Sequence, residues 1–296
     1  MVRRPASGSE REQLDLFIAL APDIPAHDQR DLMERPFFSL SKSKRVKPID
    51  YRVGDTFVRV DAAPEYGMAT IWDADILIWA ASQIVEAPQR GVMPSRRLQT
   101  TPYQLLRSIH RGTSLRDYQR LRAALDRLQS TTVVTSIRAE HLRRKRHRFS
   151  WINEWEELTD ASGRACGIEF IVPDWLYQGL LDRSLVLRID PAYFRLTGGI
   201  ERWLYRVVRK HGGRQKGGWR FTFRQLHVKS GSLARFSNFA IDLRAIAARQ
   251  SLPGYWLEIY RDEDGAEHLQ FTRRSVLPRD HPGFEWPQRF GKMDDS

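Results

Sequence analysis

The stretch from His110 to Ser136 constrains the fold most, because it joins a capped amphipathic helix directly to a β-branched segment. Thr113 or Ser114 is suited to cap a helix that runs from Leu115 to about Gln129. The residues that follow, 131–138, are rich in threonine and valine and favour a strand. At helical spacing, one apolar stripe is formed by Tyr118, Leu121, Leu125 and Leu128.

The same order of elements occurs twice along the chain. In the first half, a helix is predicted at 73–87 with Asp73 as its N-cap, and another begins at Thr101-Pro102 and ends before Gly112. The helix 115–129 and a β-hairpin follow, with a third strand at 167–173. The second half repeats that order, with a helix at 198–213, a strand and helix within 218–231, a helix at 232–250 and a hairpin at 254–274.

Helix, turn, helix and hairpin form the winged-helix arrangement, so the sequence predicts an α+β fold with two tandem winged-helix (helix-turn-helix plus β-hairpin) domains. We expect residues 1–34 to be a flexible tail with a short helical piece at 10–20. The first domain is predicted at 35–185, starting with short strands around a Val53-Gly54-Asp55 turn, and the second at 186–275. Residues 276–296 are predicted to be a C-terminal tail.

The charge of the chain indicates its partners. Forty-eight lysines and arginines against 36 acidic residues give a net charge of +12, which favours nucleic acid or an anionic membrane surface. No run approaches the roughly 20 apolar residues of a membrane span, and we expect no membrane contact and a cytoplasmic location. The single cysteine, Cys166, excludes an intrachain disulfide and is expected to be a buried thiol.

The polar face of the helix 115–129 is the leading candidate for a DNA-reading surface. Arginine and glutamine have donor patterns that match guanine and adenine edges in the major groove, and Ala123 is small enough for close approach. The alternative is an arginine-rich face that is merely solvated. The candidate DNA-binding residues here are Arg116, Gln119, Arg120 and Arg127.

A basic segment follows at the predicted hairpin tip, and we expect it to act as a wing that meets DNA phosphates. Like charges packed this closely repel each other unless a polyanion offsets them. The alternative is a hairpin that only increases solubility. The candidate residues are Arg143, Arg144, Lys145, Arg146 and Arg148.

The second half carries a weaker version of the same pattern. Arg235, Asn238 and Arg249 lie opposite the apolar face of the helix 232–250, and asparagine can read adenine. The tip of its hairpin, at 261–267, is acidic and is not expected to touch phosphates. The basic, glycine-rich segment 209–220 could hold the DNA backbone instead, or be a solvated loop.

Other residues give little sign of chemistry beyond binding. The tryptophans at 151, 155, 175, 203 and 219 have the spacing of core residues, although stacking on single-stranded bases is the alternative. There is no phosphate-binding GxxxxGK[ST] loop, no HExxH and no GxSxG motif. We therefore expect no catalytic residues, no metal and no cofactor, and a binder rather than an enzyme. A DNA-nicking enzyme is an alternative that a supercoiled-plasmid nicking assay would reveal.

Three blocks of the chain, at 105–137, 184–213 and 239–259, closely resemble the plasmid replication initiator protein A family. The resemblance spans about residues 35–274. It implies two winged-helix domains that bind repeated origin sites, called iterons, on double-stranded DNA. It also implies origin opening, recruitment of the host initiator and replicative helicase, repression of its own gene, and a homodimer in equilibrium with a monomer.

In related initiators the first domain supplies the dimer contact and the second makes the main base contacts, whereas the charges here favour the first domain as the DNA reader. The division of labour between the two domains therefore stays open. The function predicted from the sequence is that of a plasmid replication initiator. The alternative is a winged-helix transcriptional repressor without a role in replication.

Overall fold

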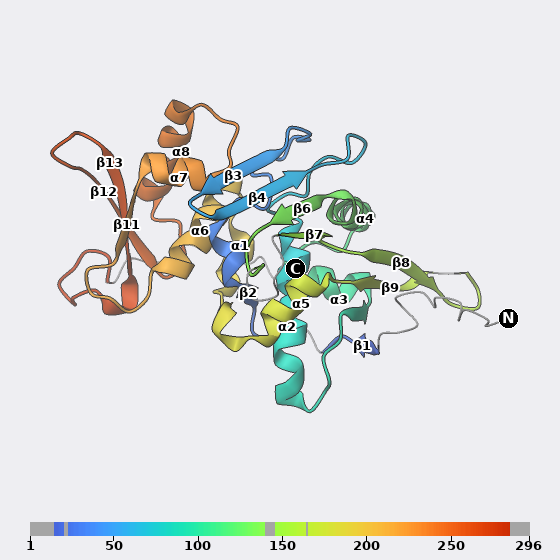
Figure 1. Cartoon of the computed structure of the whole chain (residues 1–296). Helices are drawn as coiled ribbons and strands as arrows, with labels where there is room; N and C mark the ends of the chain where they lie inside the picture. The colour runs from blue at the N-terminus through green and yellow to red at the C-terminus, as the bar shows by residue number, and fades with distance from the viewer. Residues whose placement is uncertain (1–14, 21–22, 140–145, 164, 285–296) are drawn as a thin grey trace.

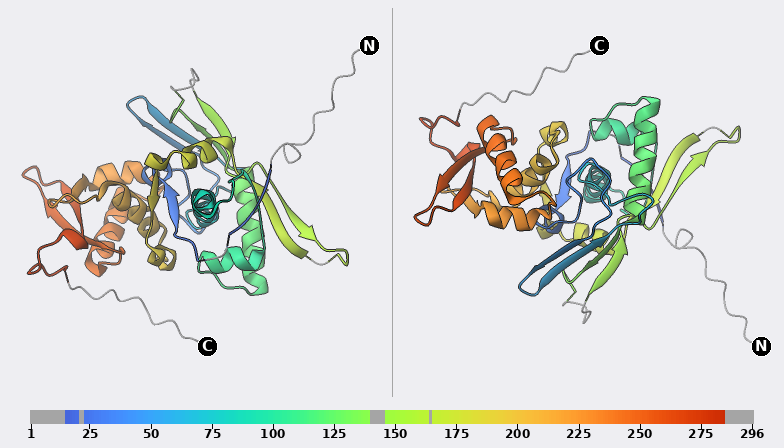
Figure 2. Two further views of the ribbon diagram at one scale, coloured as in Figure 1. Left: turned by 90° about the horizontal axis from the view of Figure 1, so that it is seen from below. Right: turned by 90° about the horizontal axis from the view of Figure 1, so that it is seen from above.

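The structure is a computed structural model that describes residues 15–20, 23–139, 146–163 and 165–284. It is a mixed α+β fold with the long buried helix α2 (Ala74–Glu86) at its centre (Figure 1). The helices and sheet of the C-terminal part lie on one side of α2, and the hairpin β8–β9 projects on the other side (Figure 2).

The elements follow the chain in an order close to the prediction. Up to the end of α4 they are β1 (Leu16–Ile18), β2 (His27–Gln29), α1 (Arg30–Glu34), β3 (Ile49–Val53), β4 (Thr56–Asp61), α2, η1 (Ala87–Arg90), β5 (Arg97–Thr100), α3 (Pro102–Ser108) and α4 (Leu115–Ser130). Next come β6 (Thr132–Thr135), β7 (His147–Ser150), β8 (Glu154–Thr159), β9 (Ala165–Ile171), α5 (Asp174–Leu181), η3 (Arg183–Leu185), β10 (Val186–Arg188) and η4 (Pro191–Arg195). The last are α6 (Gly199–His211), β11 (Trp219–Thr222), α7 (Phe223–Ser230), α8 (Phe236–Arg249), β12 (Tyr255–Arg261), β13 (Glu267–Arg273) and η5 (Arg274–Val276).

Four sheets connect these strands. Their strand orders are β1-β5-β9-β8, β3-β4-β6-β7, β10-β2 and β11-β13-β12. In the repeated order of elements, α2, β5, α3, α4, β8 and β9 correspond to α6, β11, α7, α8, β12 and β13. In both sets the strand between the first two helices pairs with the last strand of the hairpin, β5 with β9 and β11 with β13.

The local signals for helix starts act as the sequence predicts. The side chains of Thr101 and Ser114 each accept a hydrogen bond from the backbone N–H three residues later, at Gln104 and Asp117. The backbone N–H of each capping residue in turn donates to the side chain of that later residue, so α3 and α4 both begin with capping boxes. Asp73 is different, since its side chain does not cap α2. The turn between α7 and α8 needs Gly231, which has φ of +59° and packs so tightly that a Cβ would lie 2.7 Å from Pro36.

The predicted N-terminal tail is wrong for its described part. The segment expected to be helical at 10–20 contains strand β1, which pairs in parallel with β5, while residues 1–14 lie outside the described residues. Residues 27–34 form β2 and α1, and Leu32 and Met33 are buried in the core. Short segments such as these gain their structure from tertiary partners, which local patterns cannot reveal.

The hairpin predicted after the helix 115–129 is also wrong in part, because its second strand, expected in the alternating residues 149–158, is not one strand. It divides at Trp151-Ile152, both fully buried, into β7 and β8, which belong to different sheets. Period-two alternation continues through the break, so the pattern alone does not reveal the division. At the other end of the chain, Arg274 donates to the carbonyl of Gly283 at 3.1 Å, so the described part of the predicted C-terminal tail folds back on the protein.

Buried ion pairs connect α6 to the first half of the chain. Arg206 donates to the carboxylate of Asp28 at 2.7 and 3.1 Å, and both side chains are almost fully buried. Arg202 donates to the buried carboxylate of Asp75 on α2 at 2.7 and 2.9 Å. Residues of both halves, from Phe17 to Phe271, also belong to one contiguous hydrophobic core. The two halves are therefore packed together rather than linked by a tether.

Candidate nucleic-acid interface

Helix α4 presents an exposed polar face beside the first-half core. Its apolar stripe packs inward, with Leu125 and Leu128 fully buried. Arg116, Gln119 and Arg120 are exposed, as is the small Ala123 between them and the C-terminal half of the helix. Arg120 lies 3.3 Å from Asp117, a contact of low energy because it is in solvent. This face leaves long donor side chains available to a ligand.

Arg127 is not part of that exposed face, contrary to the prediction. Its guanidinium donates two hydrogen bonds of 2.8 Å to the carboxylate of Asp73, which is nearly buried at the start of α2. The bidentate pair raises the pKa of Arg127 and fixes the side chain between two helices. Its role is therefore to hold α4 against α2.

The basic hairpin tip is described only in part. Arg143, Arg144 and Lys145 lie outside the described residues, whereas Arg146 and Arg148 are exposed next to and within β7. The predicted hairpin exists as β6–β7, but it belongs to the sheet with β3 and β4. The hairpin that occupies the repeated position after α4 is β8–β9, and its first strand carries the exposed carboxylates of Glu156 and Glu157.

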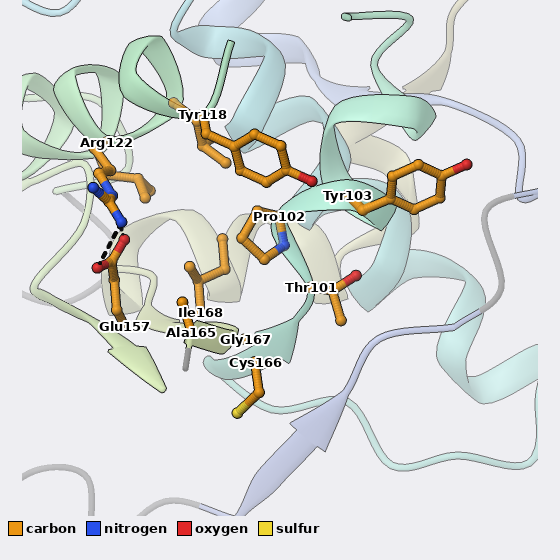
Figure 3. Close-up of a pocket in the computed structure, with 12 residues that line it drawn as sticks. Thr101, Pro102, Tyr103, Tyr118, Arg122, Glu157, Ala165, Cys166, Gly167 and Ile168 are labelled. Atoms are coloured by element: carbon orange, nitrogen blue, oxygen red, sulfur yellow. Dashed lines mark hydrogen bonds and ion pairs between the residues drawn. The ribbon is translucent and has the colours of Figure 1, made fainter. Parts of the chain in front are cut away.

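A small pocket of about 250 Å³ lies between α4, α3 and the β8–β9 hairpin (Figure 3). On one side Arg122 of α4 forms a bidentate pair with Glu157 of β8, which connects the helix to the hairpin. On the other side is Cys166, whose side chain is exposed rather than buried as expected. Cys166 is the second residue of β9, and the first two residues of this strand are exposed while the rest are buried. The prediction of a buried thiol was wrong because the thiol lies before the buried part of the strand.

Helix α8 places its candidate residues in different surroundings. Arg235 and Asn238 are exposed, while Arg249 lies 3.6 Å from Glu201 of α6. Ile241, which the sequence analysis did not propose as a binding residue, is 59% exposed at the centre of the outward face. Its apolar character among polar neighbours was the signal that could have identified it.

Two further features of the described residues bear on the interface. Trp219, predicted to be a core residue, is 47% exposed at the end of the basic loop and stacks on His211, whereas Trp151, Trp175 and Trp203 are buried as predicted. A second group of cations, Lys42, Lys44 and Arg195, meets α4 across a cleft and was missed, because these residues are far apart in the sequence.

Within the described parts of the chain, no group of three or more histidine, cysteine or acidic side chains is placed to hold a metal ion. None of the helices there combines the length and apolar composition that crossing a membrane requires. The arrangement of exposed arginine, glutamine and asparagine on two helices is suited to hydrogen bonding with base edges and phosphates.

The chain is similar to known replication proteins. Residues 27–257 match the family model described as replication initiator protein A. A protein of Wigglesworthia glossinidia brevipalpis named "Putative replication protein" is 32% identical over 235 residues, covering 78% of this chain and 84% of that protein.

Among solved structures, crystals of domains 2 and 3 of RctB give a TM-score of 0.59 with 13% identity, covering 82% of this chain and 98% of that one. A second structure of the same RctB domains has a TM-score of 0.52, also at 13% identity, and covers 80% and 94% of the two chains. At this identity the likeness concerns the fold.

Proposed function

Because the chain belongs to the replication initiator protein A family, we propose that it initiates plasmid replication by binding repeated sites on double-stranded origin DNA. The mechanism is binding rather than covalent catalysis: phosphate contacts anchor the protein and base contacts specify the site. The observation that carries the proposal is the exposed face of α4, where Arg116, Gln119 and Arg120 surround the small Ala123.

We interpret the two repeated sets of elements as tandem winged-helix units. In each set the third helix, α4 or α8, follows a turn after a shorter helix, which is the position of the recognition helix in helix-turn-helix proteins. Support comes from the matching strand pairings, β5 with β9 and β11 with β13. On this interpretation the wings are β8–β9 and β12–β13, and the basic β6–β7 hairpin is an additional element.

The acidic wings shape how the protein meets DNA. Glu156 in the first wing and Glu263 in the second are exposed and would repel phosphates. The neighbouring Glu157 is paired with Arg122, and Asp262 lies 2.7 Å from His268. The proposed phosphate contacts therefore come from elsewhere, including Arg146 and Arg148 of the β6–β7 hairpin, the Arg143-Arg144-Lys145 segment and Arg235 at the start of α8. Asn238 is proposed to contact bases, while Arg249 contributes less because Glu201 lies beside it.

The later steps are proposed from the family alone. Bound initiators would open a neighbouring DNA segment and recruit the host initiator and helicase in the cytoplasm. A dimeric form would repress the gene of the protein itself. A repressor without a replication role would use the same helices, so a plasmid-maintenance assay with the gene and its flanking origin separates the two functions.

The experiment is a footprint and a gel-shift titration on the DNA that flanks the gene. Wild-type protein should protect repeats spaced by about one helical turn or a multiple of it. If six to ten phosphates are neutralised, affinity should fall roughly 10³–10⁵-fold between 50 and 200 mM salt.

Matched variants make the test specific to α4. Arg116→Ala and Gln119→Ala should each cost about 1–3 kcal/mol of binding and relax specificity at one base pair. Arg90→Ala, an exposed arginine at the end of η1, is the control and should bind as wild type. Unchanged affinity and specificity of both α4 variants would remove α4 from the interface.

A further inference from the structure

A cleft of about 630 Å³ lies on the flank of α4, next to the face proposed to read duplex DNA. Its walls come from four parts of the chain: the segment 42–44, the segment 66–76 that leads into α2, the α3–α4 region and the residues that lead into α6. The apolar floor includes Leu121 and Ala124 of α4, which are buried residues, whereas Gln119 and Ala123 do not line it. The cleft and the outward face of α4 are therefore adjoining surfaces that meet at Arg120.

The mouth of the cleft has an excess of positive charge. Lys42, Lys44, Arg120 and Arg195 are exposed cations from three segments. Of the acidic side chains that line the cleft, Asp73 is paired with Arg127, and Asp117 accepts from the backbone N–H of Ser114 and lies 3.3 Å from Arg120, so the cations that line the cleft outnumber its acids. The exposed cations therefore create a positive potential that a ligand anion could neutralise.

The arginines deeper in the cleft add to this positive potential. Arg111 and Arg202 converge on the buried carboxylate of Asp75, at 2.7 Å each, so two cations share one acid. Burial, together with the nearby Arg195 and Arg107, lowers the pKa of His110, which lines the cleft as a neutral ring at neutral pH. Both observations are consistent with a concave, electropositive site.

Aromatic rings stand beside these cations. The ammonium group of Lys42 lies 5.4 Å from the centroid of the Trp72 ring, and both residues line the cleft. The rings of His110 and Phe194, which also line the cleft, lie 5.7 Å apart. Nucleotide recognition needs two components: aromatic rings that stack on the base and cations that pair with the phosphate. The cleft has both. The volume is also within the range of small-ligand sites.

We propose that this cleft binds a nucleotide, with its phosphate between Lys42 and Arg195 and its base against the aromatic wall. The nucleotide is either a free nucleoside triphosphate or one unit of a single DNA strand, because both present the same phosphate and base. Since the site joins the first half of the chain to the segment before α6, its occupant contacts both halves. The proposal does not depend on duplex binding by α4.

The test uses two probes with the full chain, measured by fluorescence anisotropy. One is ATP that carries an N-methylanthraniloyl fluorophore, and the other is a fluorescein-labelled oligothymidine of twelve nucleotides. The variant Lys42→Ala/Arg195→Ala removes two cations of the mouth. The control Lys47→Ala/Arg52→Ala removes one exposed lysine and one exposed arginine outside the cleft.

The cleft variant should weaken binding of at least one probe by about tenfold or more, because each lost charged contact corresponds to roughly that factor. The control should bind as wild type. Weakening for ATP alone identifies a free nucleotide, and weakening for the oligonucleotide alone identifies a single strand.

Three results would overturn the proposal: no saturable binding of either probe, equal binding by cleft variant and control, or a matching loss of duplex affinity in the cleft variant. The last result would place the cleft in the duplex-binding surface. Failure of duplex binding with retained probe binding would instead contradict only the proposed function.

Discussion

Arg116 and Arg127 belong to the same helix but have different surroundings. Arg116 is exposed at the N-terminal end of α4, whereas Arg127 is held by two hydrogen bonds to Asp73. The sequence pattern places both arginines on the polar side of the helix, because helical periodicity gives the direction in which a side chain points but not the residues that it contacts. Only the fold brings Asp73, 54 positions earlier, next to Arg127.

We predict that Arg127→Ala destabilises the protein, while Arg116→Ala affects DNA binding alone. Removing Arg127 leaves the nearly buried Asp73 without its cation, which should cost about 2–3 kcal/mol of the free energy of unfolding. Arg116→Ala should change it by less than about 0.5 kcal/mol. Urea denaturation followed by tryptophan fluorescence measures both. Equal stability of the two variants would show that the pair with Asp73 contributes little.

Glu34 makes stability depend on pH. Although burial disfavours its charge, interactions with His211, Lys210 and Lys229 hold the pKa of Glu34 well below its usual range. A carboxyl group with a lowered pKa in the folded state stabilises the protein above its unfolded pKa of about 4.3. That contribution is lost as the pH falls below this value towards the folded pKa.

The variant Glu34→Gln should therefore be less stable than wild type at pH 6, with the difference shrinking on acidification below about pH 4. Urea midpoints at pH 3, 4, 5 and 6 for both proteins give the measurement. Glu65→Gln, which replaces an exposed carboxylate, serves as control. A difference between Glu34→Gln and wild type that does not vary with pH would contradict this account.

At the scale of elements, α8 differs from α4 in having an apolar centre on its outward face. Ile241 is exposed there, next to Asn238. Two arginines of the same helix have acidic neighbours: Arg244 donates to Glu267, and Arg249 lies 3.6 Å from Glu201. An exposed isoleucine on a helix that enters the major groove can contact the methyl group of thymine. On the proposed binding mode, in which α8 enters the major groove, we infer that Ile241 contacts the methyl group of a thymine.

This inference predicts a coupling between Ile241 and one thymine of the bound duplex. Replacing that thymine by uracil removes a methyl group and should weaken wild-type binding about fourfold, as expected for about 0.8 kcal/mol. Ile241→Ala should bind both duplexes with the same lower affinity. Val228→Ala, an exposed valine on α7, is the control and should keep the fourfold preference. If Ile241→Ala keeps it too, the methyl contact lies elsewhere.

Elements with strong local signals could be predicted from the sequence, and those that depend on distant partners could not. The capping residues Thr101 and Ser114 marked the starts of α3 and α4 correctly. In contrast, β2 forms only because β10 pairs with it from more than 150 residues away. The cleft beside α4 was missed for the same reason, since Lys42 and Arg195 meet only in the folded chain.

At the scale of the whole molecule, the two repeated sets of elements share one core. Arg206 of α6 pairs with Asp28, and Arg45 donates at 2.7 Å to the carbonyl of Gly231 in the turn before α8. The contiguous hydrophobic core also includes residues of both halves. Such contacts couple the stabilities of the halves.

We therefore predict that the described halves unfold in a single cooperative transition. Circular dichroism and tryptophan fluorescence should report the same urea midpoint, as two-state unfolding requires. Arg206→Met leaves Asp28 buried without a cation and should cost about 3–5 kcal/mol, shifting both signals together. Adding Asp28→Leu to that variant should recover much of the loss, because a buried ion pair can be replaced by apolar side chains. Two separate transitions in the wild-type protein, or a shift of only one signal in Arg206→Met, would mean that the halves are independently stable and that the buried pairs only orient them.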